Sequence, residues 1–292
     1  MSFLSYLING ISLGSVYAII ALGYTMVYGI AKMLNFAHGD IIMVGGFTVF
    51  TIVSTAGGAP VVGVLASIVV CTVLGVTIEK VAYRPLRGAS PLAVLITAIG
   101  VSYFLQNAAQ LLWGATPKNF TSLVTFQVPE FLAKFNVSAV SLVTIVACLV
   151  IMAGLMFFTG KTKMGKAMRA VSEDKAAAQL MGINVNRTIS MTFAIGSALA
   201  AIAGVLLCSY SPVLQPTTGA MPGIKAFDAA VFGGNGSIPG AFVGGILIGI
   251  IEAMAQAYIS TSLANSIVFG VLIIVLLVKP AGLLGKYVPE KV

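Results

Sequence analysis

The segment MLNFAHGD, residues 33–40, gathers chemically active side chains between two apolar stretches. It holds His38, the one histidine of the chain, together with the carboxylate of Asp40 and the amide of Asn35. A histidine beside an acid at a membrane is compatible with a proton relay, a metal site, a substrate clamp or a polar turn. A lone histidine without a second ligand disfavours a metal site, and a proton relay would suit an ion-driven carrier.

We interpret this segment as a polar, glycine-containing helix start. Asn35 is expected to be the N-cap, which places Asp40 early in the helix, where the helix dipole favours an acid. Polar groups at such breaks line the substrate path of other transporters, where they face the charges of the substrate. Asn35, His38 and Asp40 are therefore candidate pathway-lining residues, with a purely structural turn as the alternative.

Lys225, Asp228 and Glu252 are charged residues within apolar stretches. A charge at the bilayer centre costs about 2.5–3.5 kcal/mol or more, so each of them needs a partner or a water-filled path. Lys225 and Asp228 are three residues apart, where a helix would pair them, and we expect them to neutralise each other. Glu252 has no cation nearby in the sequence, so it should pair with another span or face water. All three are further candidates for lining a pathway.

Polar amides also occur deep within one apolar run, at Gln106 and Asn107. A side-chain amide in lipid is usually satisfied by a neighbouring helix. We expect both residues to hydrogen-bond between helices.

The sequence carries no pattern for catalysis or nucleotide binding. The stretch GGNGSIPG, residues 233–240, contains G-x-G but not G-x-G-x-x-G, and no Walker A pattern occurs in the chain. The cysteines Cys71, Cys148 and Cys208 are far apart in apolar runs, which is typical of buried apolar residues and not of a disulfide or a metal site. We expect a protein that is not an enzyme and has no cofactor, so that any coupling to ATP comes from a partner.

The composition is that of an integral membrane protein. Hydrophobic residues make up 59% of the 292 residues and charged residues 8%, against about 25% charged residues in soluble domains. Candidate membrane segments are the apolar runs at about 4–30, 38–55, 61–79, 91–113, 137–159, 187–209, 217–232, 239–259 and 264–279. The run 217–232 is the weakest of them, because Lys225 and Asp228 interrupt it.

These runs predict an all-α polytopic membrane protein with about eight or nine transmembrane helices, short or broken ones included, folded as a single domain over residues 1–292. Gly245 and Gly249 stand at G-x-x-x-G spacing, which predicts close packing of two helices in lipid.

The positive charge indicates how the chain crosses the membrane. The net charge is +8, and the basic residues cluster in the loops 79–90 and 160–187 and in the tail that begins at Lys279. The positive-inside rule assigns all three to the cytoplasm, with the N-terminus outside and the C-terminus inside. Because this rule explains the charge, we expect no nucleic acid as a partner.

The loop 160–187 is the longest polar segment and is not loop-like in composition. Apolar residues recur in it at helical spacing among lysine and arginine, which predicts two short helices. Ser172 is expected to cap the second helix, with Glu173 and Asp174 in its first turn and Gly182 at its end. Either this amphipathic segment lies on anionic membrane lipid, or its face of alanine, leucine and methionine docks a soluble partner.

The chain resembles a known family in the following stretches: GYTMVYGIAKMLNFAHGD (23–40), IEKVAYRPLRGAS (78–90), LITAIGVSYFLQN (95–107), GKAMRAVSEDKAAAQLMGIN (165–184) and KAFDAAVFGGNGSIPGAFVGG (225–245). They are similar to the high-affinity branched-chain amino acid (Liv-type) permeases, and the likeness runs over nearly the whole chain. Within them, AAAQLMG (176–182) resembles the E-A-A-x-x-x-G loop of ABC importer permeases, with Ala176 where the glutamate often stands.

This resemblance implies a subunit of an ATP-driven amino-acid importer in the inner (cytoplasmic) membrane of a bacterium. Its implied partners are a second, related but distinct permease, two cytoplasmic ABC ATPases, and a periplasmic or surface amino-acid-binding protein. The implied ATPase-docking residues are Glu173, Asp174, Ala176, Ala177, Ala178 and Gly182. An ion-coupled secondary transporter or channel for small polar solutes is the alternative, but it would leave the surface of loop 160–187 without a role.

Overall fold

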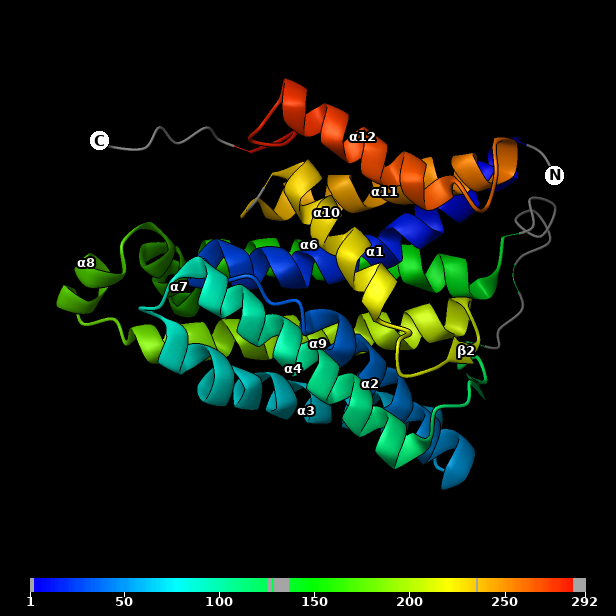
Figure 1. Cartoon of the computed structure of the whole chain (residues 1–292), viewed down its shortest axis with the longest axis horizontal. Coiled ribbons are helices and arrows are strands. Elements are labelled where there is room, and N and C mark those ends of the chain that lie inside the picture. The colour runs from blue at the N-terminus through cyan, green and yellow to red at the C-terminus, as the bar shows by residue number, and fades with distance from the viewer. Residues whose placement is uncertain (1–2, 125–127, 129–136, 235, 286–292) are drawn as a thin grey trace.

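The computed structural model describes residues 3–124, 128, 137–234 and 236–285, and these form a bundle of helices (Figure 1). The helices are α1 (Phe3–Ala31), α2 (His38–Phe50), α3 (Pro60–Ile78), α4 (Pro91–Trp113), α6 (Ala139–Lys161), α7 (Lys163–Glu173), α8 (Lys175–Leu180), α9 (Val185–Tyr210), α10 (Ala220–Gly233), α11 (Ile238–Tyr258) and α12 (Ala264–Val278). Two short strands, β1 (Lys118–Asn119) and β2 (Val213–Leu214), pair antiparallel. A π-helical turn extends α2 over Thr51–Thr55, and another extends α3 over Glu79–Tyr83 into a 3₁₀ turn at Arg84–Leu86.

The prediction of an all-α polytopic fold is confirmed. Within the described residues, seven helices are long and apolar enough to cross a membrane, namely α1, α2 with its π turn, α3 with its extension, α4, α6, α9 and α11. The shorter α12 is apolar as well, and the interrupted run 217–232 becomes the short helix α10 of 14 residues. Each of the apolar runs in the sequence therefore corresponds to a helix.

The helices form an inner and an outer layer. Of the apolar window in each span, 72% is buried in α9 and 61% in α1, but only 22% in α4 and 28% in both α3 and α6. Figure 1 shows α1 and α9 passing through the middle of the bundle, with α3 and α12 on opposite sides of it. The exposed outer layer consists of apolar side chains that lipid or another membrane subunit can cover.

Small residues allow α1 and α11 to cross with their backbones in contact. A Cβ atom added at Gly249 would lie 2.2 Å from the Cα of Gly14, and one added at Gly245 would lie 2.4 Å from the Cα of Ala18. No side chain fits at either glycine, because real Cβ atoms do not approach other heavy atoms so closely. The close packing predicted from the G-x-x-x-G spacing is confirmed.

The basic loops share one end of the bundle, which we call the basic end. The Arg87 guanidinium contacts the Glu79 carboxylate and the Asn186 amide, which brings the loop 79–90 to the start of α9. The Lys175 ammonium donates a hydrogen bond of 3.1 Å to the Ala31 carbonyl at the end of α1. The described part of the C-terminal tail lies here too, with the Leu284 N–H bonded to the carbonyl of Gly233. Lys286 and Lys291 lie outside the described residues.

Candidate functional site

The chain breaks between α1 and α2 inside the bundle and not at its surface. After α1 ends at Ala31, Lys32 takes a positive φ of 57° and the next residues are not helical. α2 begins at His38, whose ring centroid lies 4.6 Å from that of Tyr24 in α1. Tyr24 precedes Ala31 by seven residues, or about 10 Å of helix. α2 therefore begins about that far below the basic end, at membrane depth.

A second helix begins at the same depth, directly beside the first. A Cβ atom added at Gly219 would lie 1.7 Å from the Gly39 carbonyl oxygen, so the two backbones touch where α10 begins and α2 has just started. From there α10 runs to the basic end, where Gly236 packs against Gly29. The N-terminal ends of α2 and α10 thus meet within the bundle. Both ends carry the positive pole of a helix dipole.

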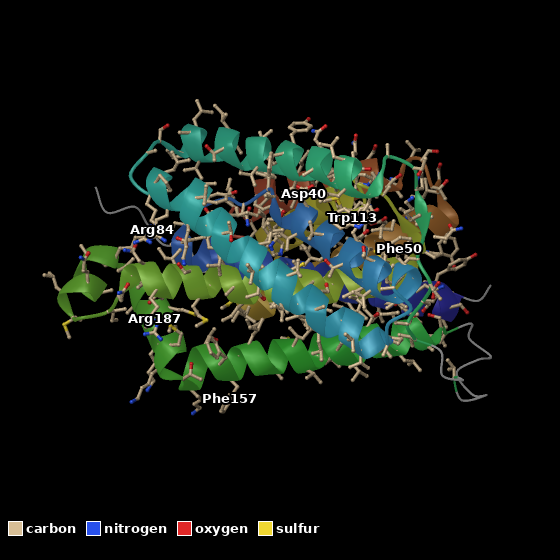
Figure 2. All side chains as sticks on the ribbon, turned by 90° about the horizontal axis from the view of Figure 1, so that it is seen from below. Asp40, Phe50, Arg84, Trp113, Phe157 and Arg187 are labelled. Carbon is tan, nitrogen blue, oxygen red and sulfur yellow. The ribbon has the colours of Figure 1, made fainter. Side chains whose placement is uncertain are left out.

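A pocket of about 340 Å³ lies beside these two helix starts. It is lined by Phe36, Asp40, Leu95, Ile99, Ser102, Tyr103, Gln106, Ala220 and Ile224, from α4, α10 and the start of α2. Figure 2 shows Asp40 near the start of α2, below the ribbon of α4. Its Oδ1 accepts a hydrogen bond of 2.9 Å from the Gln106 amide, whereas its Oδ2 is buried and has no hydrogen-bond partner in the part of the chain that the structure describes. The pocket therefore combines one incompletely satisfied carboxylate with mostly apolar walls.

His38 and Asn35, the other candidates from the segment 33–40, do not line this pocket. His38 is 1% exposed and fills the space against Gly23, where an added Cβ would lie 2.7 Å from the His38 Nε2. Asn35 is not the N-cap of α2: that position is Ala37, which makes no side-chain cap. The Asn35 Oδ1 instead accepts a 2.9 Å hydrogen bond from the hydroxyl of Tyr83, in the π-helical extension of α3. The buried amide oxygen thus has its partner on a neighbouring helix. The expected place of Asp40, in the first turn of α2, is confirmed.

The expected pairing of Lys225 with Asp228 is wrong. The Lys225 ammonium lies 2.7 Å from Oε1 of Glu252 in α11, and both side chains are buried. The Tyr17 hydroxyl donates to Oε2 of Glu252 at 2.9 Å, and the Gln256 amide donates to Oε1 at 3.0 Å. Lys225 faces Tyr17 of α1 and Glu252 of α11. The Asp228 Oδ2 is buried and has no hydrogen-bond partner among the residues that the structure describes. Glu252 does pair with another helix, one of the two outcomes expected from the sequence.

Of the two amides in α4, only one bonds as expected. Gln106 joins α4 to α2 through Asp40, whereas the Asn107 amide donates to the Tyr103 carbonyl within its own helix at 2.7 Å. Sequence reasoning missed Tyr17 as the third member of the Lys225–Glu252 cluster. No local pattern marks that tyrosine, since its partner is more than 200 residues away in the chain.

The loop 160–187 folds into the two short helices α7 and α8, as predicted. The cap of α8 is Asp174, whose Oδ1 accepts hydrogen bonds from the N–H groups of Ala176 and Ala177 at 2.8 and 3.0 Å. The prediction of Ser172 as the cap is wrong, because α7 continues to Glu173 and turns the Ser172 hydroxyl back to the carbonyl of Arg169. Glu173 accordingly ends α7 and does not open α8.

The tip of this loop presents large apolar side chains. Leu180 is 89% and Met181 82% exposed, and Gly182 ends the turn with a φ of 81°, as expected from its position. Ala178 is buried and holds α8 to the body of the protein. Burial lowers the pKa of Lys175, and the charges of Arg87 and Lys32 lower it further. The tip is thus an apolar knob set in a positively charged surrounding.

The described residues hold no group of three or more histidine, cysteine, aspartate or glutamate side chains that would suit a metal ion. They also contain no disulfide: Cys71, Cys148 and Cys208 are free and buried. What remains as a functional feature in the membrane is the Asp40 pocket, and at the basic end the α7–α8 knob.

Comparison with known proteins gives a consistent result. A family model described as "Branched-chain amino acid transport system / permease component" matches residues 6–277. The chain is 44% identical to the high-affinity branched-chain amino acid transport system permease protein LivH of Escherichia coli (strain K12), over 99% of this chain and 98% of that protein. It is 43% identical to the permease protein BraD of Pseudomonas aeruginosa over the same shares. No solved structure matches.

A more distant likeness is confined to part of the chain. The ribose import permease protein RbsC of Haemophilus influenzae is 34% identical over 97 residues, which is 31% of this chain and 30% of that protein. The full-length matches and the partial one all concern membrane components of transport systems.

Proposed function

The chain belongs to the family of permease components of branched-chain amino acid transport systems, and we propose that it forms half of the translocation path of a binding-protein-dependent ABC importer for branched-chain or other neutral amino acids. It is a multi-pass protein of the inner membrane and not an enzyme. The observation that carries the proposal is the meeting of the α2 and α10 N-termini beside the Asp40 pocket, because this arrangement offers complementary charge to both ends of a zwitterion.

The charges of an amino acid match the polar groups at this place. Its carboxylate would be stabilised by the positive poles of α2 and α10, as broken helices do for substrate carboxylates in other transporters. Its ammonium would be stabilised by Asp40, whose Oδ2 has no hydrogen-bond partner within the described ranges of the chain. Only a few contacts serve each end, which suits a path that must release its substrate again.

The apolar walls of the pocket suit a branched aliphatic side chain. Leu95 and Ile99 of α4 and Ile224 of α10 face the cavity, and its volume of about 340 Å³ leaves room for a small amino acid. Burying such a side chain against them yields about 25 cal/mol per Å² of apolar surface. The binding protein outside the membrane would supply most of the selectivity.

The exposed face of α4 is the proposed contact with a second permease subunit, a related but distinct chain. The second half of this helix exposes the side chains of Tyr103, Asn107 and Gln110. Amide groups facing hydrocarbon are unfavourable, so protein or a water-filled path should cover this face. The same face borders the Asp40 pocket, which would place the path between the two permeases.

The α7–α8 knob is the proposed docking site for a cytoplasmic ATPase. The importer would contain two such ATPases, and each permease subunit would dock one of them. Leu180 and Met181 would fit an apolar groove, and Asp174 and Gly182 shape the helix that presents them. α7 follows α6 after a single residue, so a push on the knob reaches a membrane span directly. We therefore propose that the basic end lies in the cytoplasm and the N-terminus outside, which the positive-inside rule also favours.

The test of the proposed function measures leucine uptake in proteoliposomes with the assembled importer and its binding protein. Asp40→Asn should reduce ATP-driven uptake about tenfold to a hundredfold, because one hydrogen bond to a charged group contributes about 1.5–3 kcal/mol. The ATPase rate without substrate and the leucine affinity of the binding protein should stay unchanged. Thr77→Ala, at an exposed hydroxyl of α3, is the matched control. Unchanged uptake in Asp40→Asn would refute the role of the pocket.

The ion-coupled alternative is tested in the same liposomes with this chain alone. An ABC importer subunit should give no uptake without ATPases, whatever the ion gradient. Uptake that follows a proton or sodium gradient, together with a purified native complex that contains no ATPase, would establish the ion-coupled carrier instead.

A further inference from the structure

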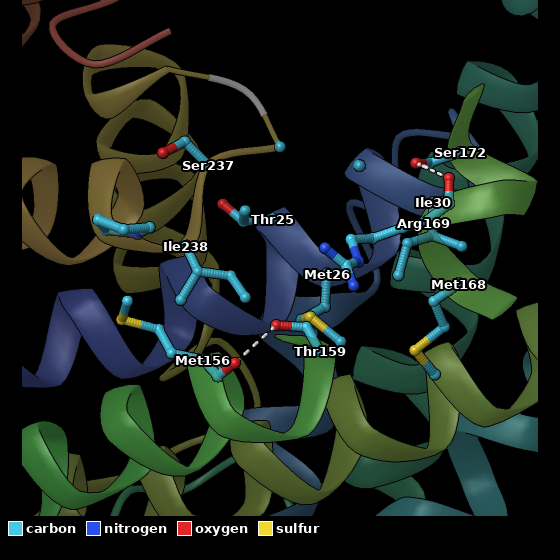
Figure 3. A pocket seen from close by; sticks show the side chains of 13 residues that line it. Thr25, Met26, Ile30, Met156, Thr159, Met168, Arg169, Ser172, Ser237 and Ile238 are labelled. Atoms are coloured by element: carbon cyan, nitrogen blue, oxygen red, sulfur yellow. Dashed lines mark hydrogen bonds between the residues drawn. The ribbon is translucent and has the colours of Figure 1, made fainter. Parts of the chain in front are cut away.

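A second pocket of about 340 Å³ opens at the basic end, where α1, α6, α7 and α11 meet (Figure 3). Arg169 of α7 is the one charged side chain among the described residues that line it, and Figure 3 shows this side chain directed toward Met26 of α1. Within the described residues Arg169 forms no salt bridge, and its guanidinium donates to the Gly160 carbonyl at 3.2 Å. The guanidinium therefore has donors left for an anion.

Two more donors converge on this pocket. Thr25 is 3% exposed, and its hydroxyl is buried and has no hydrogen-bond partner among the described residues, although the residue lines the cavity. A buried hydroxyl without a partner is unfavourable, and a ligand that accepts a hydrogen bond from it would relieve that cost. On the other side, α11 begins at the pocket with Ser237 as its cap and Ile238 as its first residue. The N-terminus of this 21-residue helix adds a positive dipole end.

An apolar groove of about 300 Å³ follows the same helices deeper into the membrane. It is lined by residues that include Ser15 of α1, Leu149 of α6 and Ile246 of α11. From Thr25 to Ser15 there are ten residues, or about 15 Å of helix. The hydrocarbon core of one leaflet has about the same depth, half of roughly 30 Å. A polar pocket at the interface is thus followed, one leaflet deeper, by an apolar groove.

We propose that this seam of α1, α6 and α11 binds an anionic phospholipid of the cytoplasmic leaflet. Its phosphate lies between Arg169, Thr25 and the N-terminus of α11, and one acyl chain reaches the apolar groove. A free phosphate would use the polar pocket alone and leave the groove without a role. The surrounding charge favours an anionic lipid too, since Lys163 and Lys166 lie on the same amphipathic helix as Arg169.

The bound lipid would tie α7 to the ends of the membrane spans. α7 connects the membrane helix α6 to the knob at Leu180 and Met181, and it contacts the pocket through Met168 and Arg169. Holding this helix against α1 and α11 keeps the knob at a fixed place relative to the membrane. Unlike the proposed amino-acid path, this site does not depend on what the protein carries.

The test is a lipid titration of the purified, delipidated chain in detergent, followed by native mass spectrometry. Phosphatidylglycerol should bind at least about fivefold tighter than phosphatidylcholine, and Arg169→Gln should abolish that preference, as expected for about 1 kcal/mol from one basic residue at the surface. Lys163→Gln is the matched control, a basic residue on the same helix that does not line the pocket. An equal loss in both variants would refute the site in favour of general surface charge.

A second variant separates lipid binding from folding. Thr25→Val removes the unpartnered hydroxyl without changing the shape of the side chain, so it should weaken phosphatidylglycerol binding while the melting temperature of the lipid-free protein is kept or raised. A variant that binds the lipid as before would overturn the proposed role of Thr25. Binding of glycerol 1-phosphate, which has the phosphate but no acyl chain, is measured in the same way. Binding as tight as that of the whole lipid would show a pocket for a free anion and refute the lipid assignment.

Discussion

The buried ion pair of Lys225 and Glu252 allows the sharpest prediction about stability. Their side chains are 7% and 6% exposed, and Tyr17 and Gln256 complete the hydrogen bonds of the carboxylate. Breaking such a pair by removing one partner leaves an uncompensated buried charge and costs about 3–5 kcal/mol. Lys225→Met and Glu252→Gln should therefore each lower the free energy of unfolding by about that amount.

The double variant decides whether the two charges really neutralise each other. With both charges removed no buried ion remains, so Lys225→Met/Glu252→Gln should be much less destabilised than the sum of the single variants, with a coupling free energy of at least about 2 kcal/mol. In Glu252→Gln, Asp228 lies three residues from Lys225 and could replace Glu252 as its partner. Such a rescue would lower the coupling free energy and would appear as a smaller loss of stability in Glu252→Gln than in Lys225→Met.

The chain provides its own probe for the assay. Its one tryptophan, Trp113, stacks on Phe47 with ring centroids 4.8 Å apart and donates a hydrogen bond to Thr51. Tryptophan fluorescence during reversible unfolding by sodium dodecyl sulfate in mixed micelles reports the loss of this contact, which involves neither of the mutated residues. The reasoning would be refuted if each single variant lost less than about 1 kcal/mol of unfolding free energy and the double variant lost the sum of the two.

Three further predictions concern packing and docking. Gly249→Leu should prevent the close crossing of α1 and α11 and destabilise the protein by about 1–3 kcal/mol or more, whereas Gly270→Leu, with no heavy atom within 4 Å of an added Cβ, should change the unfolding midpoint little. Leu180→Ser combined with Met181→Ser should weaken co-purification of the ATPases without lowering the melting temperature, and retention of a normal complex would count against the knob. Gly182→Asn, which tolerates a positive φ, should assemble better than Gly182→Val, which does not; equal assembly would show that the turn is not needed.

Much of the fold follows from local sequence patterns. Apolar length alone identifies the spans, because each membrane helix satisfies its own backbone hydrogen bonds and requires only a lipid-compatible surface. The G-x-x-x-G spacing at Gly245 and Gly249 indicated a close crossing, and Gly182 indicated the end of α8, since glycine is the residue that takes a positive φ freely. Those features depend on a few neighbouring residues.

Helix caps were predicted less well, because several acceptors compete within a few residues. Ser172 and Asp174 were both eligible to cap α8, and the choice depended on how far α7 continued. Asn35 looked like a cap for α2, but the structure uses its amide to bind Tyr83 of α3. A buried polar side chain takes whichever partner the tertiary fold brings to it.

The apolar runs, the basic loops and the permease-like stretches are enough to identify a many-helix membrane permease, its spans and the loop that projects from them. Which charges meet depends on how the helices pack: Lys225 of α10 pairs with Glu252 of α11 and not with Asp228 in its own helix. The packing also decides that α2 and α10 start side by side at Gly39 and Gly219, next to Asp40. The reason is physical: helical periodicity is a property of a short segment, but the partner of a buried polar group is set by contacts between segments far apart in the chain.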